Sequence, residues 1–256
     1  MKLSQFRISF QPSGKIYGFT GKVAQGAFLG LLKKEGDMTA DVLHFGNKRR
    51  PYSLTPIKVA TPSFFDVTSL NQELSTHLSH ILENFHEKTI LVSNREEHLL
   101  PPEIKTAYLT PQPVVEGTRI QMQFWTPVLF SSNARKARTD PYPHLDRLWG
   151  DLIKVWNLQS EDTIDAELTH SLLQQLSTPF FNFRSVRIKL GQIRVTGFIG
   201  KITFHVEDGT GLEYLLPLAR LAGYFGIGGK KAMGFGRVHV QIQNEVKEDR
   251  RTKNSL

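Results

Sequence analysis

The chain has 256 residues, of which 39% are hydrophobic, and it carries a net charge of +8 and no cysteine. These values indicate a globular protein of one large or two small domains, exclude disulfides and thiolate metal sites, and favour a polyanionic partner. No run of roughly 18 apolar residues occurs and the first residues alternate like a strand, so we expect no membrane segment, no signal peptide and a cytoplasmic location.

The first half of the chain alternates between strand and helix patterns. Apolar residues at every second position predict a strand over residues 3–10, and apolar residues at helical spacing predict a helix from Thr20 to Gly36. The further elements expected here are a short helix ending at His44, a strand over 52–59, a helix over 70–85 and strands over 89–93 and 104–110. A β-α-β-β-α-β order, that of the ferredoxin-like fold, is the simplest interpretation.

A linker follows at Pro111, Pro113 and Gly117, after which the pattern repeats. The elements expected in this half are strands over 119–130, 184–190, 193–206 and 238–242 and helices over 145–156 and 212–225. We therefore predict an α+β protein of two tandem ferredoxin-like domains, over residues 1–111 and 118–246.

The stretch 225–237 joins the last predicted helix to the last strand and holds five glycines and three cations. Glycine leaves room for a phosphate and permits positive φ, so successive backbone N–H groups can turn toward one anion. The spacing fits neither a Walker loop nor a dinucleotide fingerprint, and a tight connection is the alternative explanation. The candidate polyanion ligands in this glycine-rich loop are Gly226, Gly228, Gly229, Lys230, Lys231, Gly234, Gly236 and Arg237.

Several motifs in a fixed order resemble one family. They are Leu43-His44, residues 50–57 (Arg-Pro-Tyr-Ser-Leu-Thr-Pro-Ile), residues 126–130 (Thr-Pro-Val-Leu-Phe), residues 197–201 (Gly-Phe-Ile-Gly-Lys) and the glycine-rich loop. This combination is similar to the CRISPR-associated endoribonucleases that cut precursor CRISPR RNA, members of the RAMP superfamily. The resemblance covers nearly the whole chain and implies two ferredoxin-like domains and CRISPR repeat RNA as partner.

The resemblance also implies a catalytic set. His44 occupies the position of a histidine that activates the 2′-hydroxyl or protonates the leaving 5′-oxygen, which suits a side chain that titrates near neutrality. Arg50, or Lys48 as second choice, would stabilise the charge on the phosphorane. The products would carry a 2′,3′-cyclic phosphate and a 5′-hydroxyl, with no metal or other cofactor. In agreement, the carboxylates show no spacing typical of a two-metal nuclease.

One departure from the family concerns the first helix, where some relatives place a catalytic tyrosine. This sequence has Phe28 and Leu29 there, and Tyr17, just before the helix, is the only nearby substitute. The departure keeps a non-cleaving RNA binder open as an alternative.

Two further basic segments are candidates for phosphate contacts. In residues 184–190, alternation places Val186, Ile188 and Leu190 on one face and the cations on the other. A hairpin turn at Gly191 and Gln192 adds Arg194, and a basic loop precedes the predicted helix at 145. The candidate RNA-binding residues of these segments are Arg187, Lys189, Arg194, Arg135, Lys136 and Arg138. The wet face of a sheet and a solvated loop are the alternative explanations.

Three functions compete at this point. The first is a metal-independent endoribonuclease acting on CRISPR repeat RNA, as a monomer or homodimer. The second is a non-catalytic RAMP subunit that holds the repeat-derived handle within a CRISPR effector complex. The third is a ferredoxin-like protein that engages another protein; salt-dependent RNA affinity would separate it from the other two.

Overall fold

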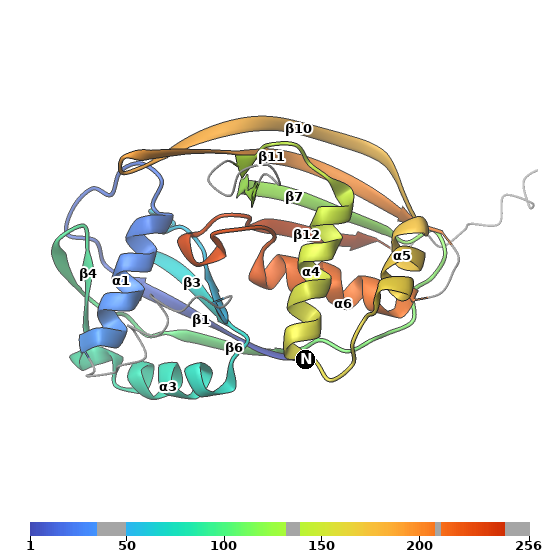
Figure 1. Ribbon diagram of the computed structural model, residues 1–256. Coiled ribbons are helices and arrows are strands. Elements are labelled where there is room, and N and C mark those ends of the chain that lie inside the picture. The colour runs from blue at the N-terminus through green and yellow to red at the C-terminus, as the bar shows by residue number, and fades with distance from the viewer. Residues whose placement is uncertain (35–49, 132–138, 208–210, 244–256) are drawn as a thin grey trace, which may run out of the picture.

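The computed structural model describes residues 1–34, 50–131, 139–207 and 211–243, and Figure 1 shows that they form two sheets with helices packed against them. The first sheet has the strand order β2-β3-β1-β6. Its elements run β1 (Lys2–Phe10), α1 (Gly21–Lys34), β2 (Tyr52–Leu54), β3 (Ser63–Ser69), α3 (Gln72–Glu83) and β6 (Glu103–Tyr108). This order and connectivity are those of a ferredoxin-like unit.

One strand of this unit was not among the predicted elements. β3 lies at the centre of the sheet and is antiparallel to both β1 and β2. Of the strand predicted over residues 52–59, only Tyr52–Leu54 forms a strand. Asp66 interrupts the apolar pattern of β3, and the structure explains it, because this carboxylate accepts a hydrogen bond from Arg7 Nε at 2.9 Å. The alternation of buried Phe65 and Val67 was the available signal.

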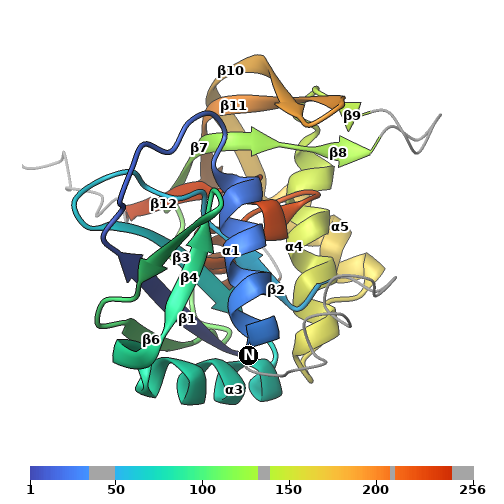
Figure 2. The same cartoon turned by 90° about the vertical axis from the view of Figure 1, so that its left-hand side faces the viewer.

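A small two-stranded sheet is inserted between α3 and β6. A 3-10 turn (Phe85–Glu87) precedes β4 (Thr89–Val92), which pairs with β5 (Arg95–His98) and packs beside α1 (Figure 2). The predicted strand over 89–93 is therefore confirmed as a strand, but it does not belong to the main sheet. The predicted short helix ending at His44 lies outside the described residues.

The second sheet has the order β10-β11-β7-β12, again that of a ferredoxin-like unit. Its elements run β7 (Arg119–Val128), β8 (Phe130–Ser131), β9 (Thr139–Asp140), α4 (Leu145–Gln159), α5 (Ala166–Gln174), β10 (Leu176–Leu190), β11 (Ile193–Val206), α6 (Leu215–Phe225) and β12 (Val238–Gln243). Short 3-10 turns at Leu212–Tyr214 and Lys231–Met233 flank α6. The predicted fold class, two tandem ferredoxin-like units, is confirmed.

Two features of this unit differ from the sequence prediction. α5 was missed because only Leu172 of its residues is buried, so its apolar stripe is short. β10 is also longer than residues 184–190, and its added part includes exposed aromatic residues and a proline, which do not alternate clearly. The hairpin turn at Gly191 and Gln192 is confirmed.

The two units share part of one core. Leu3, Leu70 and Leu109 of the first unit belong to the same buried cluster as α4, α6 and the second sheet. The Thr68 hydroxyl also donates a hydrogen bond of 2.9 Å to the carbonyl of Tyr224, which lies near the end of α6. The end of α6 and the loop after it are therefore held against the first sheet. None of the described helices has the length and apolarity needed to cross a membrane.

Candidate functional site

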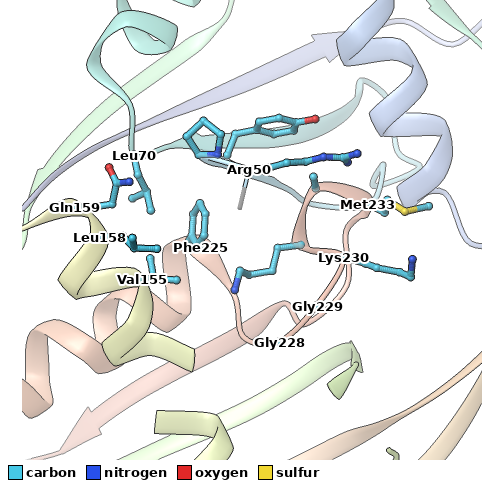
Figure 3. Close-up of a pocket in the computed structure, with 14 residues that line it drawn as sticks. Arg50, Leu70, Val155, Leu158, Gln159, Phe225, Gly228, Gly229, Lys230 and Met233 are labelled. Atoms are coloured by element: carbon cyan, nitrogen blue, oxygen red, sulfur yellow. The ribbon is translucent and has the colours of Figure 1, made fainter. Parts of the chain in front are cut away.

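A cavity of about 650 Å³ lies between the two units, where the start of β2, the last turns of α4 and the glycine-rich loop meet (Figure 3). Its walls are formed by Arg50, Pro51, Tyr52, Leu70, Val155, Leu158, Gln159, Phe225, Gly228, Gly229, Lys230, Lys231, Ala232 and Met233. Arg50 comes from one wall and Lys230 from the opposite wall. The fold thus brings the Arg50–Ile57 motif and the glycine-rich loop, far apart in sequence, to one cavity.

Hydrogen bonds within the protein occupy most of the amides of the glycine-rich loop. Gly229 N–H donates to Leu129 O at 2.7 Å, Ile227 N–H to Gly236 O at 2.9 Å, and Gly236 N–H to Pro127 O at 2.9 Å. Gly228 N–H donates to a carboxylate oxygen of Asp151 at 2.8 Å. The expectation that successive N–H groups converge on one anion is therefore wrong for these four amides.

The glycines are explained instead by close backbone packing. A Cβ on Gly236 would collide with the carbonyl oxygen of Ile227, and one on Gly228 would lie 2.8 Å from Leu129 O. Both residues also have positive φ, +67° and +87°, which side chains rarely adopt. Gly226, Gly228, Gly234 and Gly236 are buried, whereas Gly229 is exposed. Of the predicted loop glycines, Gly228 and Gly229 line the cavity, and Gly229 is the exposed one of the two.

The two lysines of the loop have different surroundings. Lys231 Nζ lies 2.7 Å from Asp151 Oδ2 on α4, and both side chains are only 12% exposed. Lys230 is exposed and has a left-handed backbone, φ +59°. The charge that the loop presents to solvent at the cavity thus comes mainly from Lys230, while Asp151, which the sequence analysis missed, neutralises much of the Lys231 charge.

Arg50 is accompanied in the cavity wall by Tyr52, a second residue not singled out from the sequence. The Tyr52 side chain is 1% exposed and its ring centroid lies 5.0 Å from that of Phe28 on α1. Burial raises the pKa of the Tyr52 hydroxyl, and the nearby positive charge of Arg50 only partly opposes this. The hydroxyl therefore stays protonated at neutral pH. The substitute named from the sequence, Tyr17, is 76% exposed and does not line this cavity.

Arg237 does not lie at a ligand-accessible surface, which corrects its assignment as an RNA ligand. Its side chain is buried, and its guanidinium donates to Tyr224 O at 2.7 Å and Ser53 Oγ at 3.1 Å, with a longer contact to Gly223 O. Burial lowers the pKa of Arg237 to about 10, so it remains charged at neutral pH. Arg237 is a cation that joins the end of α6 to β2 of the other unit.

Replacing Arg237 with alanine should destabilise the protein rather than its RNA complex alone. We expect the free energy of unfolding to fall by about 1–3 kcal/mol, because buried oxygen acceptors lose their donor. Urea unfolding measures this change, and Arg184→Ala, at an exposed position, is the matched control. An unchanged midpoint for Arg237→Ala would show that the buried contacts contribute nothing.

The basic hairpin has the geometry that its alternation predicts. Lys189 and Arg194 lie directly opposite each other on β10 and β11, and both are exposed, as is Arg187. On the other face, Leu190 is buried with Leu129, Val195 and Phe235. The hairpin therefore presents three cations to solvent. A cavity of about 400 Å³ between its tip and α1 is lined by Lys189 and Lys22, among others.

Five candidates cannot be placed. His44 and Lys48, and the loop residues Arg135, Lys136 and Arg138, lie outside the described residues. Arg50 is thus the one candidate catalytic residue that the structure locates, and its catalytic role stays a prediction.

Comparison with known proteins agrees with the motifs. Residues 122–238 match the family model of the CRISPR-associated endoribonuclease Cas6. No curated protein sequence matches the chain. Among solved structures, a Cas6 product complex superposes with a TM-score of 0.77 at 18% identity, over 94% of this chain and 100% of that one.

Two further structures show the same fold. Thermus thermophilus Cas6 gives a TM-score of 0.70 at 20% identity, with 93% of this chain and 98% of that one covered. A RAMP protein described as binding different RNA substrates gives 0.60 at 12% identity, over 94% and 100% of the two chains.

These findings define the fold of the chain as two ferredoxin-like units, the fold that it shares with solved Cas6 and RAMP structures. More particularly, the resemblance to the repeat-cleaving CRISPR endoribonucleases is confirmed: the whole described fold is that of Cas6 structures, and residues 122–238 carry the sequence pattern of the Cas6 family.

Proposed function

We propose that the chain is an endoribonuclease that cleaves CRISPR repeat RNA in precursor transcripts. The observation that carries this proposal is the cavity between the units, which is lined by both Arg50 and Lys230, residues of two motifs shared with the family. Two cations on opposite walls suit a phosphodiester between them, because a polyanion is attracted from both sides. The family match of residues 122–238 supports the same activity.

We assign the chemistry as follows. His44 moves the proton, either from the attacking 2′-hydroxyl or to the leaving 5′-oxygen, and Arg50 stabilises the charge that builds on the phosphorane. Lys48 is the second candidate for that charge. The attack of the 2′-oxygen on the phosphorus breaks the bond to the 5′-oxygen, so the products are a 2′,3′-cyclic phosphate and a 5′-hydroxyl. This route needs no metal ion.

The test is incubation of the purified protein with end-labelled RNA that carries the CRISPR repeat of its host, in excess EDTA. A single cut with a 2′,3′-cyclic phosphate end is expected. Cleavage that requires added Mg²⁺, or that leaves a 3′-hydroxyl, would refute the proposed chemistry. Size-exclusion chromatography of the protein separates a monomer or homodimer from a CRISPR effector complex. The oligomeric state, the effector complex as partner and the cytoplasmic location all stay predictions.

A second candidate is the non-catalytic RAMP subunit that holds the repeat-derived handle. It is favoured by α1, where Phe28 is fully buried and offers no hydroxyl at the position of the relatives' tyrosine. Tight RNA binding without a cut in the assay above would favour this function.

Replacing Lys230 with alanine should weaken RNA binding without unfolding the protein. Because Lys230 is exposed, one lost phosphate contact should make the slope of log affinity against log salt shallower by about 0.7–0.9. Titrations at several salt concentrations measure this slope. Lys105→Ala, at a lysine that is 65% exposed on β6, is the control. An unchanged slope for Lys230→Ala would remove Lys230 from the site.

A further inference from the structure

The second sheet has a face that its helices leave open. α4, α5 and α6 lie on the other face (Figures 1 and 2). The strand register fixes which residues lie together on the open face. Asn182, Lys201 and Gln123 lie side by side across β10, β11 and β7, and Phe180, Thr203 and Gln121 form the next row. Trp125 lies two residues beyond Gln123 on β7 and therefore on the same face.

Two large aromatic side chains on this face are exposed to solvent. Trp125 is 51% exposed and Phe180 is 50% exposed, whereas Trp149 and Trp156 are 1% and 0% exposed in the core. Phe180 and Trp125 lie two strands apart, which is about 10 Å across the sheet. They are also four residues apart along the strand direction, which is about 13 Å. Amide groups and Lys201 fill the area between them. This face therefore presents two aromatic rings together with hydrogen-bonding amide groups to the solvent.

The strands of the second sheet carry basic residues but no acidic ones. None of the four strands, β7, β10, β11 and β12, contains an aspartate or glutamate, although the chain has 24 of them. The first sheet is different, because on its outer face Arg7 is paired with Asp66 and Glu103. Cations such as Lys201 and Arg184 on the second sheet therefore have no carboxylate on their own strands to neutralise them.

We propose that this open face binds single-stranded RNA, with Trp125 and Phe180 stacking on unpaired bases and Lys201 and Arg184 contacting the backbone. Aromatic side chains on a four-stranded sheet bind unpaired bases in this way, and amides such as Gln123 and Asn182 can hydrogen-bond base edges. The site is separate from the cavity, because α4, which lines that cavity, packs on the opposite face. The inference rests on the proposed function, which supplies RNA as the ligand. It adds that unpaired nucleotides outside the cleavage site bind to this surface.

Tryptophan fluorescence of the full chain tests the site directly, because Trp125 is the one exposed tryptophan of the three. A short oligouridine, which forms no stem, should quench this emission and shift it to a different wavelength. Wild-type protein whose emission and anisotropy are unaffected by oligouridine would overturn the inference.

Variants then locate the contact. With fluorescein-labelled oligouridine, Trp125→Ala and Phe180→Ala should each weaken binding roughly fivefold to hundredfold, as expected for the loss of one stacked base. Tyr108→Ala, which removes an aromatic side chain 70% exposed on β6 of the first sheet, is the matched control and should bind like wild type. Two different aromatic positions keep the test valid if one variant fails to fold. Equal affinity of both folded variants and wild type would overturn the inference.

The outcomes separate this inference from the proposed function. A protein that cleaves repeat RNA in EDTA but does not bind oligouridine refutes only the open-face site. A protein that binds oligouridine through Trp125 and Phe180 without cutting repeat RNA refutes only the endonuclease function. A partner protein on this face would leave oligouridine unbound, and that outcome also refutes the inference.

Discussion

Replacing His44 with alanine is expected to slow cleavage of repeat RNA by about 10²- to 10⁴-fold, the usual contribution of a general acid or base. RNA affinity should stay within about twofold, because the phosphate contacts that dominate RNA affinity come from lysine and arginine side chains. Single-turnover cleavage with enzyme in excess measures the rate of the chemical step, and a filter-binding titration measures affinity. The proposal depends on the motif order that places His44 six residues before Arg50.

The control for this variant is His98→Ala, at an exposed histidine on β5. It should cleave at the wild-type rate. If His44→Ala also cleaves at the wild-type rate, His44 is not the general acid or base. A pH profile adds a check, because loss of a general acid or base should remove one limb of the wild-type profile.

Replacing Arg50 with alanine is expected to lower the cleavage rate by about 10²- to 10³-fold, as when one electrostatic stabiliser of a transition state is removed. Arg50 lines the cavity, and its charge acts at close range on the buried Tyr52 hydroxyl. Arg50→Lys should recover part of the rate, because lysine keeps the charge but not the planar fork of donors. Single-turnover kinetics again gives the rate constants.

Arg220→Ala, at an exposed arginine on α6, serves as the matched control and should leave the rate unchanged. The competing assignment is Lys48. A wild-type rate for Arg50→Ala together with a large loss for Lys48→Ala would transfer the electrostatic role to Lys48.

Most of the fold could be predicted because apolar periodicity marks each element that packs against a core. β1, α1, α4 and β11 follow such patterns and were found with nearly correct bounds. β3 was missed because Asp66 is stabilised by Arg7 on a neighbouring strand, a contact that no local pattern contains. Propensity and periodicity describe one segment at a time, whereas ion pairs across strands depend on the topology.

The site was predictable to a smaller extent. The sequence motifs assigned the Arg50 segment and the glycine-rich loop to the same function, and the structure places both at one cavity. The sequence could not, however, distinguish exposed cations from buried ones. Arg237 and Lys230 look alike in the sequence, yet one is buried against α6 and the other is in solvent. Tyr52 and Asp151 gave no signal because their importance comes from neighbours that are far away in the chain: Phe28 for one and Lys231 for the other.

The hydrogen bonds that tie the glycine-rich loop to Pro127, Leu129 and Asp151 have a consequence for the thermodynamics of RNA binding. A loop that must be ordered by its ligand loses conformational entropy on binding, about 1–2 kcal/mol for each residue fixed. Here the backbone conformation is set when the chain folds, so that entropic cost belongs to folding and is absent from the RNA complex. Substitutions of the buried loop glycines should therefore reduce the yield of folded protein, while the molecules that do fold bind RNA with nearly unchanged affinity.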